Sequence, residues 1–234
     1  MRRVLATVVA PLVFVTVAVP SATAQEKPVT LNLGGGYTFA LGEVREHLGD
    51  GFNINVGMTY NVNEKVGIQA EYSFTGLGQK LVDLPTVTPP PGLTALRNIY
   101  ADMNMQYVNF NVLFKPSTEN RMKPYLVTGA GVYFRPVTVT TPGAGYMPPY
   151  CDPWFYWCYP GGLVPVDYIL AEETSTDFGI NLGGGVNFGL SEAASFYVEM
   201  RYHYIFGPEL KNSAGESQGK ANGQFLPITF GFRF

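Results

Sequence analysis

Apolar side chains alternate with small or polar ones over eight separate runs of the chain, and this two-residue period predicts β-strands. Residues 52–62 show it most clearly, because every even-numbered side chain is apolar and every odd-numbered one is small or polar. The eight runs are 31–41, 52–62, 66–75, 107–114, 125–135, 178–190, 196–206 and 226–234. Most of them are close to the roughly 9–11 residues that a tilted strand needs to cross a bilayer core.

The connections between these runs differ in length. The connections at 63–65 and 191–194 are short and 115–124 is moderate, whereas 42–51, 77–104, 136–176 and 207–223 are long. Short periplasmic turns and longer outer loops are typical of outer-membrane barrels, and an even number of strands places both chain ends in the periplasm. The expected fold is therefore all-β, an eight-stranded antiparallel up-and-down transmembrane β-barrel.

Alternation alone also fits a soluble lipocalin-like barrel, whose apolar face would point into its interior. Here the polar face carries mainly Asn, Gly, Thr and Ser rather than the Lys and Glu of a solvated surface. Tyrosines and phenylalanines recur near the ends of the runs, as in the aromatic girdles of membrane barrels. We therefore expect the apolar face to meet lipid. The facing of 125–135 stays open: if Arg135 points inward, Leu126, Val132 and Phe134 point outward.

Composition agrees with a barrel that contacts lipid. Charged residues make up only 14% of the chain, which contains 27 glycines, 15 tyrosines and 16 phenylalanines, whereas soluble domains carry roughly 25% charged residues. The net charge is −3 at pH 7 and no basic patch is present, so we expect no nucleic-acid partner.

The N-terminus has the pattern of a cleaved signal peptide. Arg2 and Arg3 precede an apolar run at 4–19, and Ala22-Thr23-Ala24 offers small residues at the positions that a signal peptidase reads. We expect cleavage after Ala24, which makes 1–24 the signal peptide and 25–234 the barrel domain. After residue 24, no apolar run reaches the roughly 18 residues of a transmembrane helix.

Several motifs resemble the OmpA-like outer-membrane β-barrel superfamily in its small eight-stranded form. They are Lys123-Pro124-Tyr125 before Gly129-Ala130-Gly131, Asp177-Phe178-Gly179 before Gly183-Gly184-Gly185, Tyr197-Val198-Glu199-Met200-Arg201-Tyr202 with His203-Tyr204, and the terminal Phe230, Phe232 and Phe234. The resemblance covers about residues 28–234. It implies a bacterial outer-membrane location, contact with lipid and lipopolysaccharide, and recognition of the terminal phenylalanines by the barrel-assembly machinery.

Five titratable residues fall on the inward face, namely Glu71, Glu199, Arg201, His203 and Arg233. Eight strands enclose a lumen that side chains can just fill, so a wide pore is not expected and the charges should pair. Because the last two runs are neighbours, Arg233 and Glu199 should lie close together. The set could be a structural salt-bridge plug or, alternatively, a gated ion path or proton site.

Catalytic chemistry finds little support among these residues. A histidine such as His203 can act as a base or metal ligand, and lipid A deacylases use a Ser-His-acid set that faces the lipid. His203 is expected to point inward, with no serine two residues later, and Ser73 and Glu71 give no convincing nucleophile–base pair with it. We expect a hydrogen-bonded lumen histidine, no metal, no cofactor and no enzyme.

The connection 136–176 contains both cysteines of the chain, Cys151 and Cys158. An exported loop lies in an oxidising compartment, which favours a disulfide between them, whereas two thiols alone make a poor zinc site. The bridge would hold an aromatic knob formed by Trp154, Phe155, Tyr156 and Trp157. Exposed aromatic clusters often mark contact surfaces. The knob could bind a surface ligand, or it could fold over the barrel mouth or rest on lipopolysaccharide.

The resulting hypothesis is an integral outer-membrane protein that supports envelope integrity and presents loops for surface interaction, including adhesion. The alternative is a narrow channel or carrier for small solutes. A lipid-modifying outer-membrane enzyme is a more distant alternative.

Overall fold

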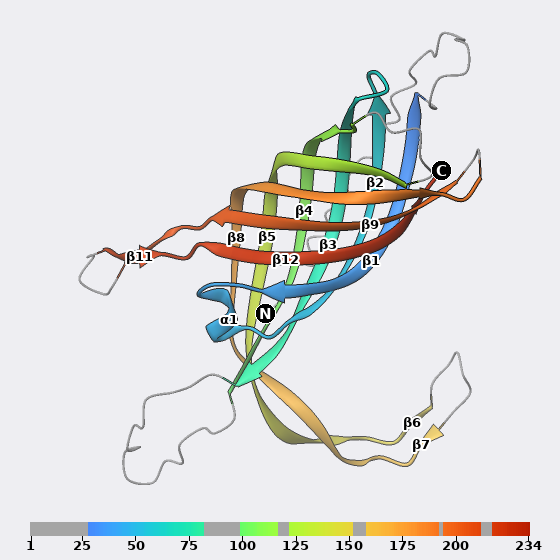
Figure 1. The fold of residues 1–234 in the computed structure, drawn as a ribbon. Coiled ribbons are helices and arrows are strands. Elements are labelled where there is room, and N and C mark those ends of the chain that lie inside the picture. Colours follow the sequence, from blue (N-terminus) through green and yellow to red (C-terminus); the bar gives the residue numbers. More distant parts are fainter. Residues whose placement is uncertain (1–27, 82–98, 117–121, 152–157, 192–193, 212–216) are drawn as a thin grey trace.

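The computed structural model describes residues 28–81, 99–116, 122–151, 158–191, 194–211 and 217–234. Eight long antiparallel strands close into one barrel, in the ring order β1, β12, β9, β8, β5, β4, β3 and β2 (Figure 1). Their bounds are β1 Val29–Ala40, β2 Gly51–Asn61, β3 Val66–Leu81, β4 Tyr100–Phe114, β5 Met122–Met147, β8 Gly162–Gly189, β9 Ser195–Phe206 and β12 Gly223–Arg233. The structure confirms the expected fold class.

The shorter elements lie in the connections. Helix α1 (Val44–His47) links β1 to β2, and β6 (Tyr150–Cys151) pairs with β7 (Cys158–Tyr159). Strands β10 (Glu209–Lys211) and β11 (Ser217–Lys220) form a second small sheet between β9 and β12. None of the helices in the described ranges is long and apolar enough to cross a membrane.

Pairing of the first strand with the last closes the ring. Its register runs from Asn32 opposite Arg233 to Ala40 opposite Phe225. The tight connection between β2 and β3 is stabilised by Asn63, whose Oδ1 accepts hydrogen bonds from the backbone amides of Lys65 (2.9 Å) and Val66 (2.8 Å). An asparagine that bonds backbone amides two and three residues ahead favours such a turn.

The faces of the strands follow the alternation. In β2, Asn53 and Asn55 are buried inside the barrel while Phe52 and Ile54 are exposed on its outside. The facing of β5, which the sequence left open, is now settled. Leu126 is 62% exposed and Val132 53% exposed on the outside, while the Arg135 side chain is only 11% exposed.

The predicted extents of two connections, 77–104 and 136–176, are wrong. The connection expected at 77–104 is shorter, because β3 continues to Leu81 and β4 begins at Tyr100. Most of the expected loop 136–176 is a long β-hairpin, in which β5 and β8 stay paired as far as Met147 opposite Gly162.

Prolines do not stop this hairpin. Beyond Thr140, which is opposite Tyr100, β5 is no longer paired with β4. Pro142 therefore lies on a strand with one free edge, which is the kind of strand that tolerates proline in a sheet.

The two ends of the barrel differ. We call the end that carries α1, the sheet β10–β11 and the outer part of β5 and β8 the loop end (Figure 1). The opposite end, with the 63–65 turn and Phe234, is the turn end (Figure 1). The expected signal peptide, 1–24, lies outside the described residues and stays a prediction.

Candidate functional site

Arg201 connects opposite walls of the lumen. It lies on β9, and β3, which carries Glu71, is four strands away in either direction around the ring. Arg201 Nη1 donates to Glu71 Oε1 at 2.8 Å, and Nη2 forms an ion pair with Glu199 Oε1. These three side chains are only 3–4% exposed. A buried arginine between two carboxylates compensates charges that would otherwise be costly in this narrow space.

Arg233 extends this cluster toward the turn end. Its Nη2 lies 3.7 Å from Glu199 Oε2, and its Nη1 donates to Asn187 Oδ1 at 2.9 Å. The guanidinium also lies over the rings of Tyr125 and Tyr197, 4.4 and 4.7 Å from their centroids. Tyr125 Oη donates to Glu199 Oε2 at 2.8 Å. The structure thus brings together four of the five residues singled out from the sequence, Glu71, Glu199, Arg201 and Arg233.

A chain of amide side chains crosses the lumen beside this cluster. Asn181 on β8 donates to Asn111 on β4 at 3.0 Å, Asn111 donates to Gln69 on β3 at 3.0 Å, and Gln69 donates to Asn32 on β1 at 3.4 Å. These four residues were predicted only as part of the polar face. Alternation places an asparagine inside, but it does not reveal which asparagines meet across a barrel.

His203, the fifth predicted residue, belongs to a separate aromatic layer. Its Nδ1 is hydrogen-bonded to Tyr133 Oη at 2.8 Å, and its ring stacks on Phe225 with 4.5 Å between centroids. Tyr133 Oη also donates to Asn109 Oδ1 at 3.0 Å, and Tyr107 stacks on Tyr133 at 4.9 Å. The Ser73 hydroxyl donates to Glu71 at 3.4 Å. Within the described ranges, no group of three or more His, Cys, Asp or Glu residues could hold a metal ion.

Inward-facing glycines make room for the large side chains of this network. A Cβ atom on Gly185 would lie 2.6 Å from Tyr125 Oη, and one on Gly179 would lie 2.6 Å from a ring carbon of Tyr133. Such distances are far below van der Waals contact, so the tyrosines can occupy the lumen only because these positions lack side chains.

Near the loop end, Arg135 forms an ion pair that the sequence analysis missed. Its Nε and Nη2 donate to Asp177 Oδ2 at 2.9 and 2.6 Å, and its guanidinium also bonds the Ala221 carbonyl. Ser175 donates to the same carboxylate at 2.7 Å. Both charged residues lay at the limits of predicted strands, but their pairing depends on the register of β5 and β8.

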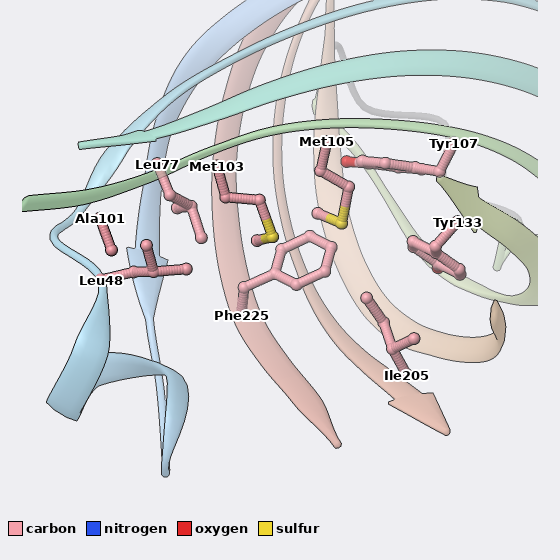
Figure 2. Packing of buried hydrophobic residues seen from close by; sticks show 9 residues of the cluster. All are labelled: Leu48, Leu77, Ala101, Met103, Met105, Tyr107, Tyr133, Ile205 and Phe225. Atoms are coloured by element: carbon pink, nitrogen blue, oxygen red, sulfur yellow. The ribbon is translucent and has the colours of Figure 1, made fainter. Parts of the chain in front are cut away.

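The inward face becomes apolar at the loop end. Nine buried side chains form a cluster there (Figure 2): Leu48, Leu77, Ala101, Met103, Met105, Tyr107, Tyr133, Ile205 and Phe225. A smaller buried apolar cluster of Leu113, Tyr125 and Val127 lies toward the turn end. The expected polar inward face therefore holds mainly for the middle of the barrel.

The remaining predicted residues that the structure describes lie outside the lumen. Cys151 and Cys158 form a disulfide at the tip of the long hairpin, where β6 pairs with β7. The aromatic knob Trp154, Phe155, Tyr156 and Trp157 lies outside the described residues. Phe230, Phe232 and Phe234 point outward and are about half exposed, with fractions of 48%, 46% and 52%. Their role in assembly stays a prediction.

Residues 8–234 match the model of the family described as outer membrane protein beta-barrel domain. Neisserial surface protein A has a similar solved structure, with a TM-score of 0.52, 13% identity and coverage of 88% of this chain and 96% of that one. A major outer membrane protein of Thermus thermophilus scores 0.49 at 11% identity, covering 89% and 99% of the two chains. The outer membrane protein OprG of Pseudomonas aeruginosa scores 0.43 at 14% identity, covering 90% and 97%. No curated protein sequence matches this chain. At such identities, the structural likeness shows the fold alone.

Proposed function

Since this chain belongs to the outer-membrane β-barrel family, we propose that it is a closed, non-enzymatic barrel that acts through the structures presented at its loop end. In this family architecture the longer connections face the cell exterior and the short turns face the periplasm. The protein would strengthen the envelope and support surface interaction. The outward apolar side chains would contact lipid, and the loop end would contact lipopolysaccharide or a surface ligand.

The observation that carries the proposal is the filled cross-section of the lumen. The ion pair between Arg201 and Glu71 joins opposite walls, and the amide chain from Asn181 to Asn32 crosses the same interior. Opening a path would require separating buried charges, which is costly without replacement partners. This supports a structural plug over the alternative of a narrow channel or carrier. His203, bonded to Tyr133 and stacked on Phe225, supports a structural role over a catalytic one.

The long hairpin supplies the surface for interaction. Beyond Thr140, as far as Met147, β5 pairs only with β8, so this two-stranded ribbon extends past the rim of the barrel (Figure 1). Apolar and aromatic side chains on it are strongly exposed, including Leu163 at 81%, Tyr146 at 70% and Ile169 at 63%. Exposed apolar groups gathered on one projecting element are typical of contact surfaces.

Shortening this hairpin tests the proposed function. Thr141 and Tyr168 are opposite each other, so residues 142–167, which include Tyr146 and Leu163, can be replaced by an Asn-Gly turn that suits a two-residue hairpin connection. Cells displaying the shortened protein should attach less to at least one of three surfaces, namely neighbouring cells, host-cell monolayers and immobilised polysaccharide.

A matched control shortens the other small hairpin, with residues 212–216 replaced by the same turn between Lys211 and Ser217, which are paired. Heat-modifiable gel migration should show a folded barrel for both variants. Equal attachment of the wild type and the 142–167 variant to all three surfaces, with the barrel intact, would remove the hairpin from the proposed function.

A further inference from the structure

A cavity of about 420 Å³ lies inside the loop end of the barrel. Its walls come from elements far apart in the sequence: α1 and the following Leu48, Leu77 of β3, Met103 of β4, Ile205 of β9 and Phe225 of β12. Figure 2 shows these side chains converging from separate strands. The volume is within the range of small-molecule sites, which are mostly apolar with a few polar groups. We call this cavity the mouth cavity.

The mouth cavity has a closed floor. Phe225 lines the cavity and stacks on His203, which is bonded to Tyr133 at 2.8 Å. Tyr107 packs against Tyr133 and lies 5.8 Å from Phe225, measured between ring centroids. The ion pairs of Arg201 lie deeper in the lumen. A molecule that entered from the loop end would therefore be held at this aromatic floor and would not pass through.

The rim of the mouth cavity is polar and carries both signs of charge. Glu43, Glu46 and His47 contribute from the α1 region, and Lys220 contributes from β11. Arg135 also lines the cavity, but its charge is paired with Asp177 at 2.6 Å. Both signs of charge lie at the rim, whereas the apolar walls favour a hydrocarbon or aromatic body.

We propose that the mouth cavity binds a small, uncharged, mainly apolar molecule, with any polar end directed to the rim. This site is separate from the hairpin surface and goes beyond the proposed function. Met103 suits such a site because a flexible, polarizable thioether adapts to ligands of different shape. The chemistry defines the class of ligand as hydrophobic and uncharged, with a volume that fits the cavity.

Methionine methyl NMR on the full barrel in phospholipid nanodiscs tests this directly. N-phenyl-1-naphthylamine is an uncharged aromatic probe whose ring current shifts nearby methyl signals. Met103 lines the mouth cavity, while Met58 and Met200 face outward and are 49% and 52% exposed, so they report partition into lipid. The Met103 signal should shift and saturate as the probe is added. The Met58 and Met200 signals should drift without saturation.

Two alanine substitutions provide a matched pair of variants. Ala101→Trp fills the mouth cavity, because Ala101 lines it, whereas Ala70→Trp adds the same side chain on the outward face of neighbouring β3. A101W should raise the half-saturation concentration for Met103 by about tenfold or more, equivalent to about 1.4 kcal/mol. A70W should leave it unchanged. Leu48→Trp, outside the barrel strands, fills the same cavity if A101W does not fold.

The proposal fails if Met103, Met58 and Met200 shift in parallel without saturation, since the probe would then be in lipid only. It also fails if a folded A101W or L48W variant retains the wild-type saturation of Met103. Neither result depends on attachment through the hairpin, so the proposal for the mouth cavity can be refuted while the proposal for the hairpin stands, and the reverse.

Discussion

The middle and the mouth of the lumen are built by the same strands yet have opposite chemistry. Strand β9 contributes Arg201 to the middle and Ile205 to the mouth, and β3 contributes Glu71 and Leu77 in the same way. The middle is held by ion pairs and hydrogen bonds that cross the barrel, whereas the mouth is an apolar cavity. Facing inward therefore does not determine side-chain chemistry. One lumen can therefore be closed by polar contacts in its middle and lined by apolar side chains at its mouth.

Removal of Arg201 should have the largest effect, because the middle depends on compensated charge. Arg201→Met leaves Glu71 and Glu199 buried without their shared partner, which should lower the free energy of unfolding by about 3–5 kcal/mol. Urea unfolding in lipid vesicles, followed by gel migration, measures this.

Two further variants sharpen the contrast with the mouth. The double variant Arg201→Met, Glu71→Gln should recover most of the loss, since the buried charges that remain, Glu199 and Arg233, are still paired. Met103→Leu at the mouth, which nearly conserves volume, should cost less than about 1.5 kcal/mol. A loss for R201M no larger than that of M103L would end the distinction between the two regions.

The second prediction concerns space in the middle of the lumen. Gly185→Ala places a methyl group 2.5 Å from the Val198 carbonyl oxygen and 2.6 Å from Tyr125 Oη, and should cost about 1–3 kcal/mol through overpacking. The adjacent Gly184 is the control, because a Cβ there would be no closer than 3.1 Å to other atoms. The difference between the urea unfolding midpoints of G185A and G184A measures the effect. Equal midpoints would contradict the tight packing around residue 185.

The third prediction concerns the boundary between the two regions. Tyr133→Phe keeps the ring but removes the hydroxyl that joins Asn109 and His203, which should cost about 1 kcal/mol. Tyr107→Phe is the control, because the Tyr107 hydroxyl makes only a weak hydrogen bond: it accepts from the Thr75 hydroxyl at 3.5 Å, the limit for such a bond. The same unfolding assay should rank Y133F below Y107F in stability, and the reverse order would contradict the hydrogen-bonded layer.

The smallest effect on the barrel is expected at the hairpin tip. Replacing both Cys151 and Cys158 with serine should change barrel unfolding by no more than about 0.5 kcal/mol, because the bridge lies beyond the ring of eight strands. Limited proteolysis should nevertheless cut the hairpin of the double variant faster than that of the wild type. A large fall in barrel stability would show that the hairpin and barrel unfold as one unit.

Alternation alone predicted the eight strands and the facing of all of them except 125–135, because the period of two is a direct consequence of strand geometry. It also predicted the proximity of Arg233 and Glu199, which lie on neighbouring strands. It could not predict that Arg201 meets Glu71, since contacts across a barrel depend on strand tilt and stagger.

Two other features escaped the sequence analysis for local reasons. The hairpin was taken for a loop because Pro142, Gly143 and Gly145 interrupt the apolar alternation while the backbone pairing continues. The apolar mouth was missed because Leu77 and Met103 fell within the expected loop 77–104. Both errors occur where strands continue beyond the residues that show the apolar–polar alternation.

Single-channel recording in planar bilayers tests most directly the claim that side chains close the lumen. Wild-type protein, shown to be folded by heat-modifiable gel migration, should give no current steps above the bare membrane at either polarity. Reproducible ohmic steps from that folded protein would contradict a lumen sealed by Arg201, Glu71 and Glu199.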